Sequence, residues 1–315
     1  MSDIFTIDAS NQNLVTEDIV VPFIIDAPSL PGSAVRVSSV LNEILGSHNY
    51  PDSVSSILAE LLMLTAMLGA SGEPKNVVTI QIQSGDGPVS FMVADFVTDG
   101  SLRGFAKYDS DRIDQYNTDT HSVSDFFGHK AIMVVTLDSG NDNMHQAVIE
   151  VTGNTISECF EEYFRSSEEM SVTIKSSVIK NKEQDSWVAG SIILQDIKNI
   201  RVVDAEKEAE DAENWNRVTT LLATVTDDEL VNTQLTLYDL LYRLFNEDGV
   251  RVVEPKNLHK GCRCNREKIC QMLQNMSSDD REYMKVDGKI QVNCEFCNKI
   301  ESYVDAGDYS PKCVI

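Results

Sequence analysis

Basic residues are scarce in this sequence. Lysine and arginine number 26 among 315 residues, against 50 aspartates and glutamates, which gives a formal net charge of −24 at pH 7. Contacts with nucleic-acid phosphates and with anionic lipid surfaces depend on lysine and arginine. The imbalance therefore argues against nucleic-acid and membrane partners, and it favours solubility without bearing on the fold.

Long apolar runs and targeting signals are missing as well. The longest apolar run, Ile57–Ala70, has about 14 residues and contains Glu60 and Thr65, whereas a bilayer span needs roughly 20. The run predicts a buried core helix. Met1–Ser10 has no basic segment followed by an apolar one, so we expect no signal peptide and a soluble, cytoplasmic protein.

Motifs that would indicate an enzyme are also lacking. The sequence has no GxxxxGK[ST] phosphate loop, and Asn293 stands where the zinc deaminase pattern has proline before CxxC. Its serine, histidine and aspartate residues form no recognisable nucleophile arrangement. We predict that the chain is not an enzyme.

The first 200 residues have the pattern of an α+β domain. Val78, Ile80 and Ile82 alternate with polar residues, and the turn signals SGDGP (84–88) and Asp99–Gly100 follow. Short strands joined by tight turns indicate antiparallel pairing instead of βαβ units. We expect strands at residues 78–82, 89–97, 102–108, 131–138, 145–152, 172–178 and 187–195.

Three helices are predicted in the same region. Leu30–Gly32 (LPG) is interpreted as a turn that precedes a helix at Val37–Leu45, and apolar residues at helical spacing predict a second helix at Ser53–Leu68. Thr155, with Glu158 three residues later, matches a capping box that opens a helix to about Ser167.

The character of the chain changes near residue 198. Asp204–Glu213 contains six acids and one base, which indicates a solvated helical or flexible linker. Two amphipathic stretches follow, and we expect them to pack on the N-terminal domain, with partner binding as the alternative. Their apolar residues are Val218, Leu221, Leu222 and Val225, then Leu237, Leu240, Leu241, Leu244 and Phe245.

Cysteines are concentrated at the C-terminal end. Of the seven, Cys159 stands alone and six lie in the last 54 residues. Cys262 and Cys264 form a CxC pair, Cys294 and Cys297 form a CxxC pair, and 29 residues separate the two pairs. Two thiolate pairs brought together by a folded loop can complete a tetrahedral four-cysteine zinc site. Asp287–Gly288 predicts a hairpin that presents the second pair.

The spacing of the cysteines leaves two roles for this zinc open. A closed shell of four cysteines is usually a static structural anchor. A redox switch is the alternative, because oxidation removes the ligands from a module of about 60 residues, a size at which a core alone is marginal. A disulfide within CxC would close a tight, strained and easily reduced ring.

Six segments along the chain form a recognisable set: LPGSAVRVSSVLNEIL (Leu30–Leu45), QSGDGPVSFMVADF (Gln83–Phe96), LRGFA (Leu102–Ala106), EEYFRSSEE (Glu161–Glu169), GCRCNREKI (Gly261–Ile269) and VDGKIQVNCEFC (Val286–Cys297). Together they resemble the 33 kDa chaperonin family, the redox-regulated heat-shock holdases of the bacterial cytosol. They run in the order expected of that family over nearly the whole chain.

The resemblance implies a function for the whole chain. The reduced protein would bind one zinc ion through Cys262, Cys264, Cys294 and Cys297 and be inactive. Hypochlorous acid, or peroxide with heat, would form the disulfides Cys262–Cys264 and Cys294–Cys297 and release zinc. The C-terminal module and the linker at residues 213–246 would then unfold, and a homodimer would hold unfolding client proteins without ATP during oxidative stress.

The predicted organisation has three parts. Residues 1–197 form an N-terminal antiparallel-sheet domain with packed helices, which binds clients and dimerises. Residues 198–255 form the acidic and amphipathic helical linker, and residues 256–315 form the small C-terminal zinc-binding redox-switch domain. The acidic run is stronger than the resemblance leads us to expect.

Other cysteines and other functions are weighed against this interpretation. Cys159, Cys270 and Cys313 are expected to be plain thiols, with off-pattern disulfides on oxidation as the alternative for Cys270 and Cys313. His259 is expected to be solvated. The main alternative is an interaction protein whose four-cysteine zinc site is a static anchor. A zinc-ribbon nucleic-acid binder is disfavoured because six bases and six acids lie between Cys262 and Cys297.

Overall fold

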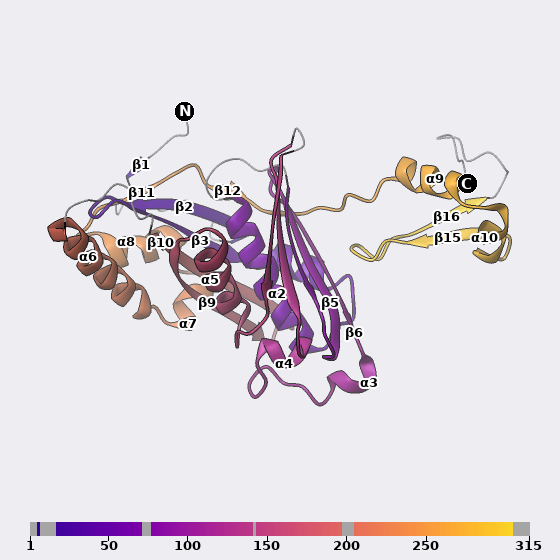
Figure 1. Ribbon diagram of the computed structural model, residues 1–315, viewed down its shortest axis with the longest axis horizontal. Helices are drawn as coiled ribbons and strands as arrows, with labels where there is room; N and C mark the ends of the chain where they lie inside the picture. Colours follow the sequence, from indigo (N-terminus) through magenta and orange to yellow (C-terminus); the bar gives the residue numbers. More distant parts are fainter. Residues whose placement is uncertain (1–4, 7–16, 71–76, 141–142, 197–204, 305–315) are drawn as a thin grey trace. The chain divides into compact units, whose positions relative to one another are not determined.

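The computed structural model describes residues 5–6, 17–70, 77–140, 143–196 and 205–304. The chain divides into two compact units, residues 1–260 and 261–315 (Figure 1). Each unit is described by itself. Asp204 and Cys313, which the sequence analysis singles out, lie outside the described residues.

The first unit combines two antiparallel sheets with helices. Its described helices are α1 (Ser39–Leu45), α2 (Asp52–Ala70), α3 (Ser110–Ile113), α4 (Val123–Phe127), α5 (Ile156–Ser167), α6 (Ala205–Ala223), α7 (Asp227–Val231) and α8 (Leu237–Phe245). Its described strands are β1 (Phe5–Thr6), β2 (Ile19–Ile25), β3 (Leu30–Val37), β4 (Val77–Gln83), β5 (Val89–Val97), β6 (Ser101–Tyr108), β7 (Ile132–Asp138), β8 (Met144–Glu150), β9 (Ser171–Asn181), β10 (Ser186–Asp196), β11 (Val250–Val252), β12 (Lys256–Asn257) and β13 (His259–Lys260).

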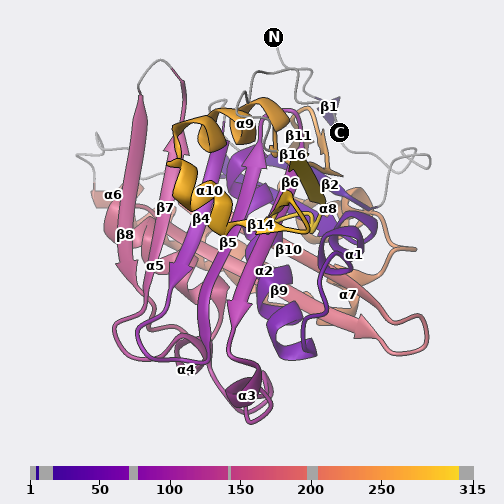
Figure 2. The same cartoon turned by 90° about the vertical axis from the view of Figure 1, so that its right-hand side faces the viewer.

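The strands form one seven-stranded and one six-stranded sheet. The first has the order β1-β11-β2-β3-β10-β9, with β12 also paired to β2. The second has the order β13-β6-β5-β4-β7-β8, and Figure 2 shows β8, β7, β4, β5 and β6 side by side. Among the pairs that the structure describes, β13 with β6 is parallel and the others are antiparallel. The predicted α+β class with antiparallel sheets is confirmed.

Helix α2 forms the centre of the main core. It packs against β3 and β10 of one sheet and against β4, β5 and β6 of the other. By length and composition α2 could cross a membrane, but 78% of its most apolar 18-residue window is buried. A helix that is apolar on all sides is expected between two sheets, and the prediction of a buried core helix is confirmed.

The linker helices cover the other face of the seven-stranded sheet. Inward-facing residues of β2, β3 and β10 form one buried cluster with residues of α6, α7 and α8. Both predicted amphipathic stretches contribute, so the expectation that they pack on the N-terminal domain is confirmed. The exposed residues Ala209–Glu213 belong to the acidic half of α6.

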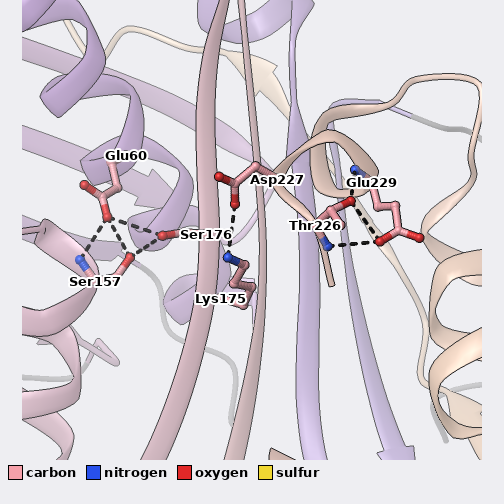
Figure 3. Close-up of polar contacts among 7 residues, drawn as sticks. All are labelled: Glu60, Ser157, Lys175, Ser176, Thr226, Asp227 and Glu229. Atoms are coloured by element: carbon pink, nitrogen blue, oxygen red, sulfur yellow. Dashed lines mark hydrogen bonds and ion pairs between the residues drawn. The ribbon is translucent and has the colours of Figure 1, made fainter. Parts of the chain in front are cut away.

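A buried carboxylate joins α2 to α5 and β9 (Figure 3). Glu60 accepts hydrogen bonds from the backbone N–H groups of Ile156 and Ser157 and from the Ser157 hydroxyl, at 3.2, 3.0 and 2.6 Å. The first two are N–H groups of the first turn of α5, which have no partner within the helix. Burial raises the pKa of Glu60, and these hydrogen bonds oppose the rise.

Two local predictions in the N-terminal region are wrong. Leu30–Gly32 begins strand β3 instead of forming a turn, and Val37 ends that strand instead of opening a helix. Gly32 is needed for packing, since a Cβ there would lie 2.4 Å from Phe23 Cζ and 2.7 Å from the Ile193 carbonyl oxygen. Pro31 is tolerated because the pairing of β3 with β10 ends at Gly32.

The chain returns to both sheets after α8. Val250–Val252 pairs with β2, and so does Lys256–Asn257, while His259–Lys260 pairs with β6. The first unit therefore extends to Lys260. The functional division at 197/198 and 255/256 stays a prediction.

The second unit is small. Its described elements are α9 (Arg266–Asn275), α10 (Ser278–Tyr283), β14 (Lys285–Val286), β15 (Lys289–Asn293) and β16 (Ile300–Val304), and the strands pair in the order β14-β15-β16. The buried cluster in the described part comprises Cys270, Leu273, Ile290 and Tyr303. A core of this size contributes little free energy to the folding of a small unit.

Candidate metal centre

Two loops of the second unit carry the cysteine pairs. Cys262 and Cys264 precede α9, whose N-cap Asn265 accepts a hydrogen bond from the backbone N–H of Glu267. Cys294 follows directly after β15. The cap fixes where the first loop ends, and the strand fixes where the second begins.

A tight hairpin sets the direction of the second loop. Asp287 and Gly288 join β14 to β15 with φ values of 52° and 74°. Two positive φ values are typical of a type I′ turn, which aspartate and glycine favour. Beyond β15 the chain turns again: Asn298 N–H donates to the Cys294 carbonyl at 2.8 Å, and Cys294 N–H donates to the Lys299 carbonyl at 3.0 Å. The predicted hairpin is confirmed.

The four sulfur atoms converge on one point. All lie within 4.8 Å of one another, with Sγ–Sγ distances of 3.5 Å from Cys262 to Cys294 and 3.8 Å from Cys264 to Cys297. Zinc–sulfur bonds of about 2.3 Å place the sulfurs of a regular tetrahedron about 3.8 Å apart. The four cysteines could therefore hold a metal ion, and their geometry fits zinc.

The electrostatics of the cluster favour a cation. At Cys262 burial opposes ionisation, but hydrogen bonds from Cys264 and from the other thiols outweigh it and lower the pKa to about 7. At Cys264 the hydrogen bond with Cys262 and then burial raise the pKa to about 12. One thiolate thus forms readily, and its negative charge disfavours ionisation of the neighbouring thiols. A divalent cation is therefore needed to hold four thiolates together.

The site is open to small reagents. Cys264 is exposed, and Cys262, Cys294 and Cys297 are half-buried. Since thiolate reactivity depends on access as well as on pKa, an oxidant in solution can reach the cluster.

Other candidate residues lie elsewhere. Cys270 is buried in the core of the second unit, and Cys159 is buried in α5 of the first. His259 belongs to the first unit and lies 3.1 Å from the Ser101 hydroxyl through Nε2. None of the three is part of the cluster of four cysteines.

Comparisons with known proteins agree with this architecture. The family model for the Hsp33 protein matches residues 18–303. The chain belongs to the Hsp33 family. It is 34% identical over 298 residues to the 33 kDa chaperonin of Caulobacter vibrioides, covering 91% of this chain and 94% of that protein. Identity to the 33 kDa chaperonin of Pseudomonas fluorescens is 28% over 299 residues, covering 94% and 93%.

A solved structure shares the fold. The crystal structure of the 33 kDa chaperonin from Thermotoga maritima matches with a TM-score of 0.75 at 20% identity, covering 91% of this chain and 95% of that one. Membership of the Hsp33 family supports a chaperone function and the binding of unfolded proteins. The resemblance that the sequence motifs indicate is thus confirmed.

One buried charged residue that bonds to the linker helices of this Hsp33 protein was not predicted from the sequence. Arg36 of β3 is fully buried, and its guanidinium donates to three backbone carbonyls in and after α7. One signal was present: a single charge in the otherwise apolar segment Ala34–Val37. A buried arginine needs partners, but the sequence does not show where they lie.

Proposed function

We propose that this protein is a redox-regulated, ATP-independent holdase chaperone, inactive when reduced and zinc-bound. The observation that carries the proposal is that four accessible cysteines converge at one point of a unit with a small core. The linker helices that cover an apolar sheet face supply the second component. We further propose a cytoplasmic location and a homodimer as the active form.

In the reduced state Cys262, Cys264, Cys294 and Cys297 would hold the zinc ion. Zinc, when bound, would fasten the two loops to each other and contribute about 10–16 kcal/mol to folding of the module. The four thiolates carry two charges more than the ion neutralises. Because all four positions of the tetrahedron would be filled by protein, no open position remains for a substrate.

Oxidation would act on the thiols themselves. In each pair, Cys262 with Cys264 and Cys294 with Cys297, two thiolates lose two electrons as one S–S bond forms. Hypochlorous acid is the oxidant: it takes up the electrons and leaves as chloride and hydroxide. The disulfide sulfurs no longer serve as thiolate ligands, so the module loses its metal and its fold.

Release of α6, α7 and α8 would then create a binding surface. The sheet face beneath them carries apolar side chains of β2, β3 and β10, which are buried while the helices are docked. These residues are Ile19, Val21, Phe23, Ala34, Ile192 and Leu194. An apolar patch of this kind binds proteins that expose their own cores, and such binding needs no nucleotide.

The proposal is tested by light scattering from guanidinium-unfolded luciferase diluted into buffer. The protein is added either reduced and zinc-loaded or treated with hypochlorous acid, and released zinc is measured with a chelating dye. We expect suppression of aggregation by the oxidised, zinc-free protein alone. A Cys264→Ser variant should change zinc content and the response together.

Two results would contradict the switch. Equal suppression by both forms would leave a chaperone without redox control. Zinc retention under oxidant, or zinc loss with no gain in activity, would favour the alternative of an interaction protein with a static zinc anchor.

A further inference from the structure

The contact between the linker and the seven-stranded sheet centres on one charged side chain. Arg36 lies on β3, on the face that α6–α8 cover, and its exposed fraction is 0%. Its Nε donates to the Leu230 carbonyl at 2.8 Å, Nη1 to the Leu235 carbonyl at 2.6 Å and Nη2 to the Glu229 carbonyl at 3.1 Å. The guanidinium thus joins the end of α7 to the turn before α8.

A glycine beside Arg36 allows this close approach. Gly190 of β10 is the register partner of Arg36. A Cβ at Gly190 would lie 2.3 Å from the Leu230 carbonyl oxygen and 2.8 Å from its carbon. The same backbone carbonyl therefore contacts both residues, and no side chain larger than hydrogen fits beneath it.

Apart from the buried Leu230 side chain, the other polar contacts of α7 are exposed and weaker. Figure 3 shows Lys175 of β9 paired with Asp227 at 3.1 Å, and a capping box between Thr226 and Glu229. The Lys175 and Asp227 side chains are 35% and 62% exposed. Exposed ion pairs of this kind contribute little to stability, and the capping box stabilises α7 itself without attaching it to the sheet.

We propose that Arg36 and Gly190 form the latch that keeps the linker helices docked and the chaperone inactive. This proposal rests on the proposed function and identifies its regulatory contact. The carbonyls of Leu230 and Leu235 lie in buried contacts and that of Glu229 in a part-buried one, and all three have the guanidinium as donor. Without it they would lose hydrogen bonds inside the interface, whereas an undocked linker would have water as partner. Loss of the latch therefore favours release of the linker even while the cysteines are reduced.

The test uses the full chain, reduced and zinc-loaded, with the variants Arg36→Met, Arg36→Lys and Gly190→Ala. Methionine keeps much of the side-chain volume and removes the donors. Lysine keeps the positive charge but lacks the planar guanidinium group with its several N–H donors. Alanine at Gly190 displaces the Leu230 carbonyl while Arg36 is intact, so it remains informative if Arg36→Met does not fold. The matched control is Arg103→Met, which removes an arginine bound to Asp95 at 2.7 Å on the other sheet.

Hydrogen exchange measured by mass spectrometry reports docking. We expect amides of α7 and α8 to exchange at least about tenfold faster in Arg36→Met and Gly190→Ala, equivalent to about 1.4 kcal/mol, with a smaller change in Arg36→Lys. Peptides of the second unit should be unchanged and zinc retained. The control should leave α7 and α8 as in the wild type. Unchanged exchange in both latch variants, or equal acceleration in the control, would overturn the proposal.

Light scattering with unfolded luciferase reports activity. The reduced latch variants should suppress aggregation that the reduced wild type does not. Faster exchange without this gain, while the oxidised wild type is active, would overturn the regulatory role. If the oxidised wild type is itself inactive, the proposed function fails, and the exchange result alone still decides whether Arg36 holds the linker.

Discussion

Removal of the metal should unfold the second unit and leave the first unit folded. The perturbation is a strong chelator added to the reduced protein at neutral pH, so that no disulfide forms. The described core of this unit has four buried residues, of which Leu273, Ile290 and Tyr303 are large. The first unit has two separate and larger buried clusters, so we expect the two units to respond differently.

The magnitudes support this expectation. Burying a large apolar side chain stabilises a fold by about 1.5–3 kcal/mol, so the three large side chains together contribute about 5–9 kcal/mol. A structural zinc site contributes about 10–16 kcal/mol near neutral pH. Loss of the metal therefore removes a term larger than the apolar core supplies.

The assay is hydrogen exchange of peptides from α9 and β15, with zinc content measured in parallel. We expect full exchange of these peptides in the metal-free protein and protection in the zinc-loaded one. Cys297→Ser should bind zinc substoichiometrically and behave like the chelated protein. Cys270→Ala serves as the control, because Cys270 is a core residue outside the four-sulfur cluster. Continued protection of β15 after complete zinc removal would refute the reasoning.

Three further predictions concern the first unit. Leu241→Ala, at a fully buried position of α8, should weaken linker docking by about 2–5 kcal/mol and speed hydrogen exchange of the α8 amides. Tyr242→Ala, at a residue that is 39% exposed, should do neither. Equal effects of the two variants would argue against docking through the buried face of α8. Burial raises the pKa of Glu60, so the folded protein binds this proton more tightly than the unfolded chain does, and stability is lost as pH rises above the ordinary glutamate pKa of about 4.3. Between pH 4.5 and 7.5 the urea midpoint of Glu60→Gln should therefore rise relative to that of the wild type. A change in the opposite sense would show that the hydrogen bonds to Glu60 outweigh its burial. Burial raises the pKa of Cys159 to about 11, so about one thiol in a thousand is ionised at pH 8. Mass spectrometry should therefore find little labelling of Cys159 by iodoacetamide in the folded protein, and Cys159→Ser should leave activation by hypochlorous acid unchanged. Rapid labelling of Cys159 in the folded protein would contradict this prediction.

Local signals made much of the fold predictable. Alternation of Val78, Ile80 and Ile82 identified a strand that the structure places in β4. Asp287–Gly288 identified a hairpin, because few residues adopt two successive positive φ values. In each case the information lies within a few residues of the feature itself.

Features fixed by distant contacts could not be predicted. Leu30–Gly32 looks like a turn, yet Gly32 is required by the proximity of Phe23 and of the Ile193 carbonyl. The strands β11, β12 and β13 are two or three residues long, and they exist because β2 and β6 offer free edges to them. So short a segment carries no periodicity of its own.

The candidate site shows the same division. The CxC and CxxC spacing predicted which four sulfurs would meet, because metal ligation leaves a local signature in each loop. The latch leaves no comparable signature. Arg36 is 194 residues from Leu230 along the chain, and its partners are backbone carbonyls, which every residue possesses.

Release of the linker is a transition with its own free energy, distinct from unfolding of the zinc module. The buried cluster that holds α6–α8 consists of residues between Ile19 and Val252, all within the first unit. Unfolding of the second unit removes none of these side chains. Release of the linker after oxidation therefore has to overcome its own apolar contacts and the Arg36 hydrogen bonds. The latch variants weaken the linker alone and chelation weakens the module alone, so the two transitions can be measured separately in one chain.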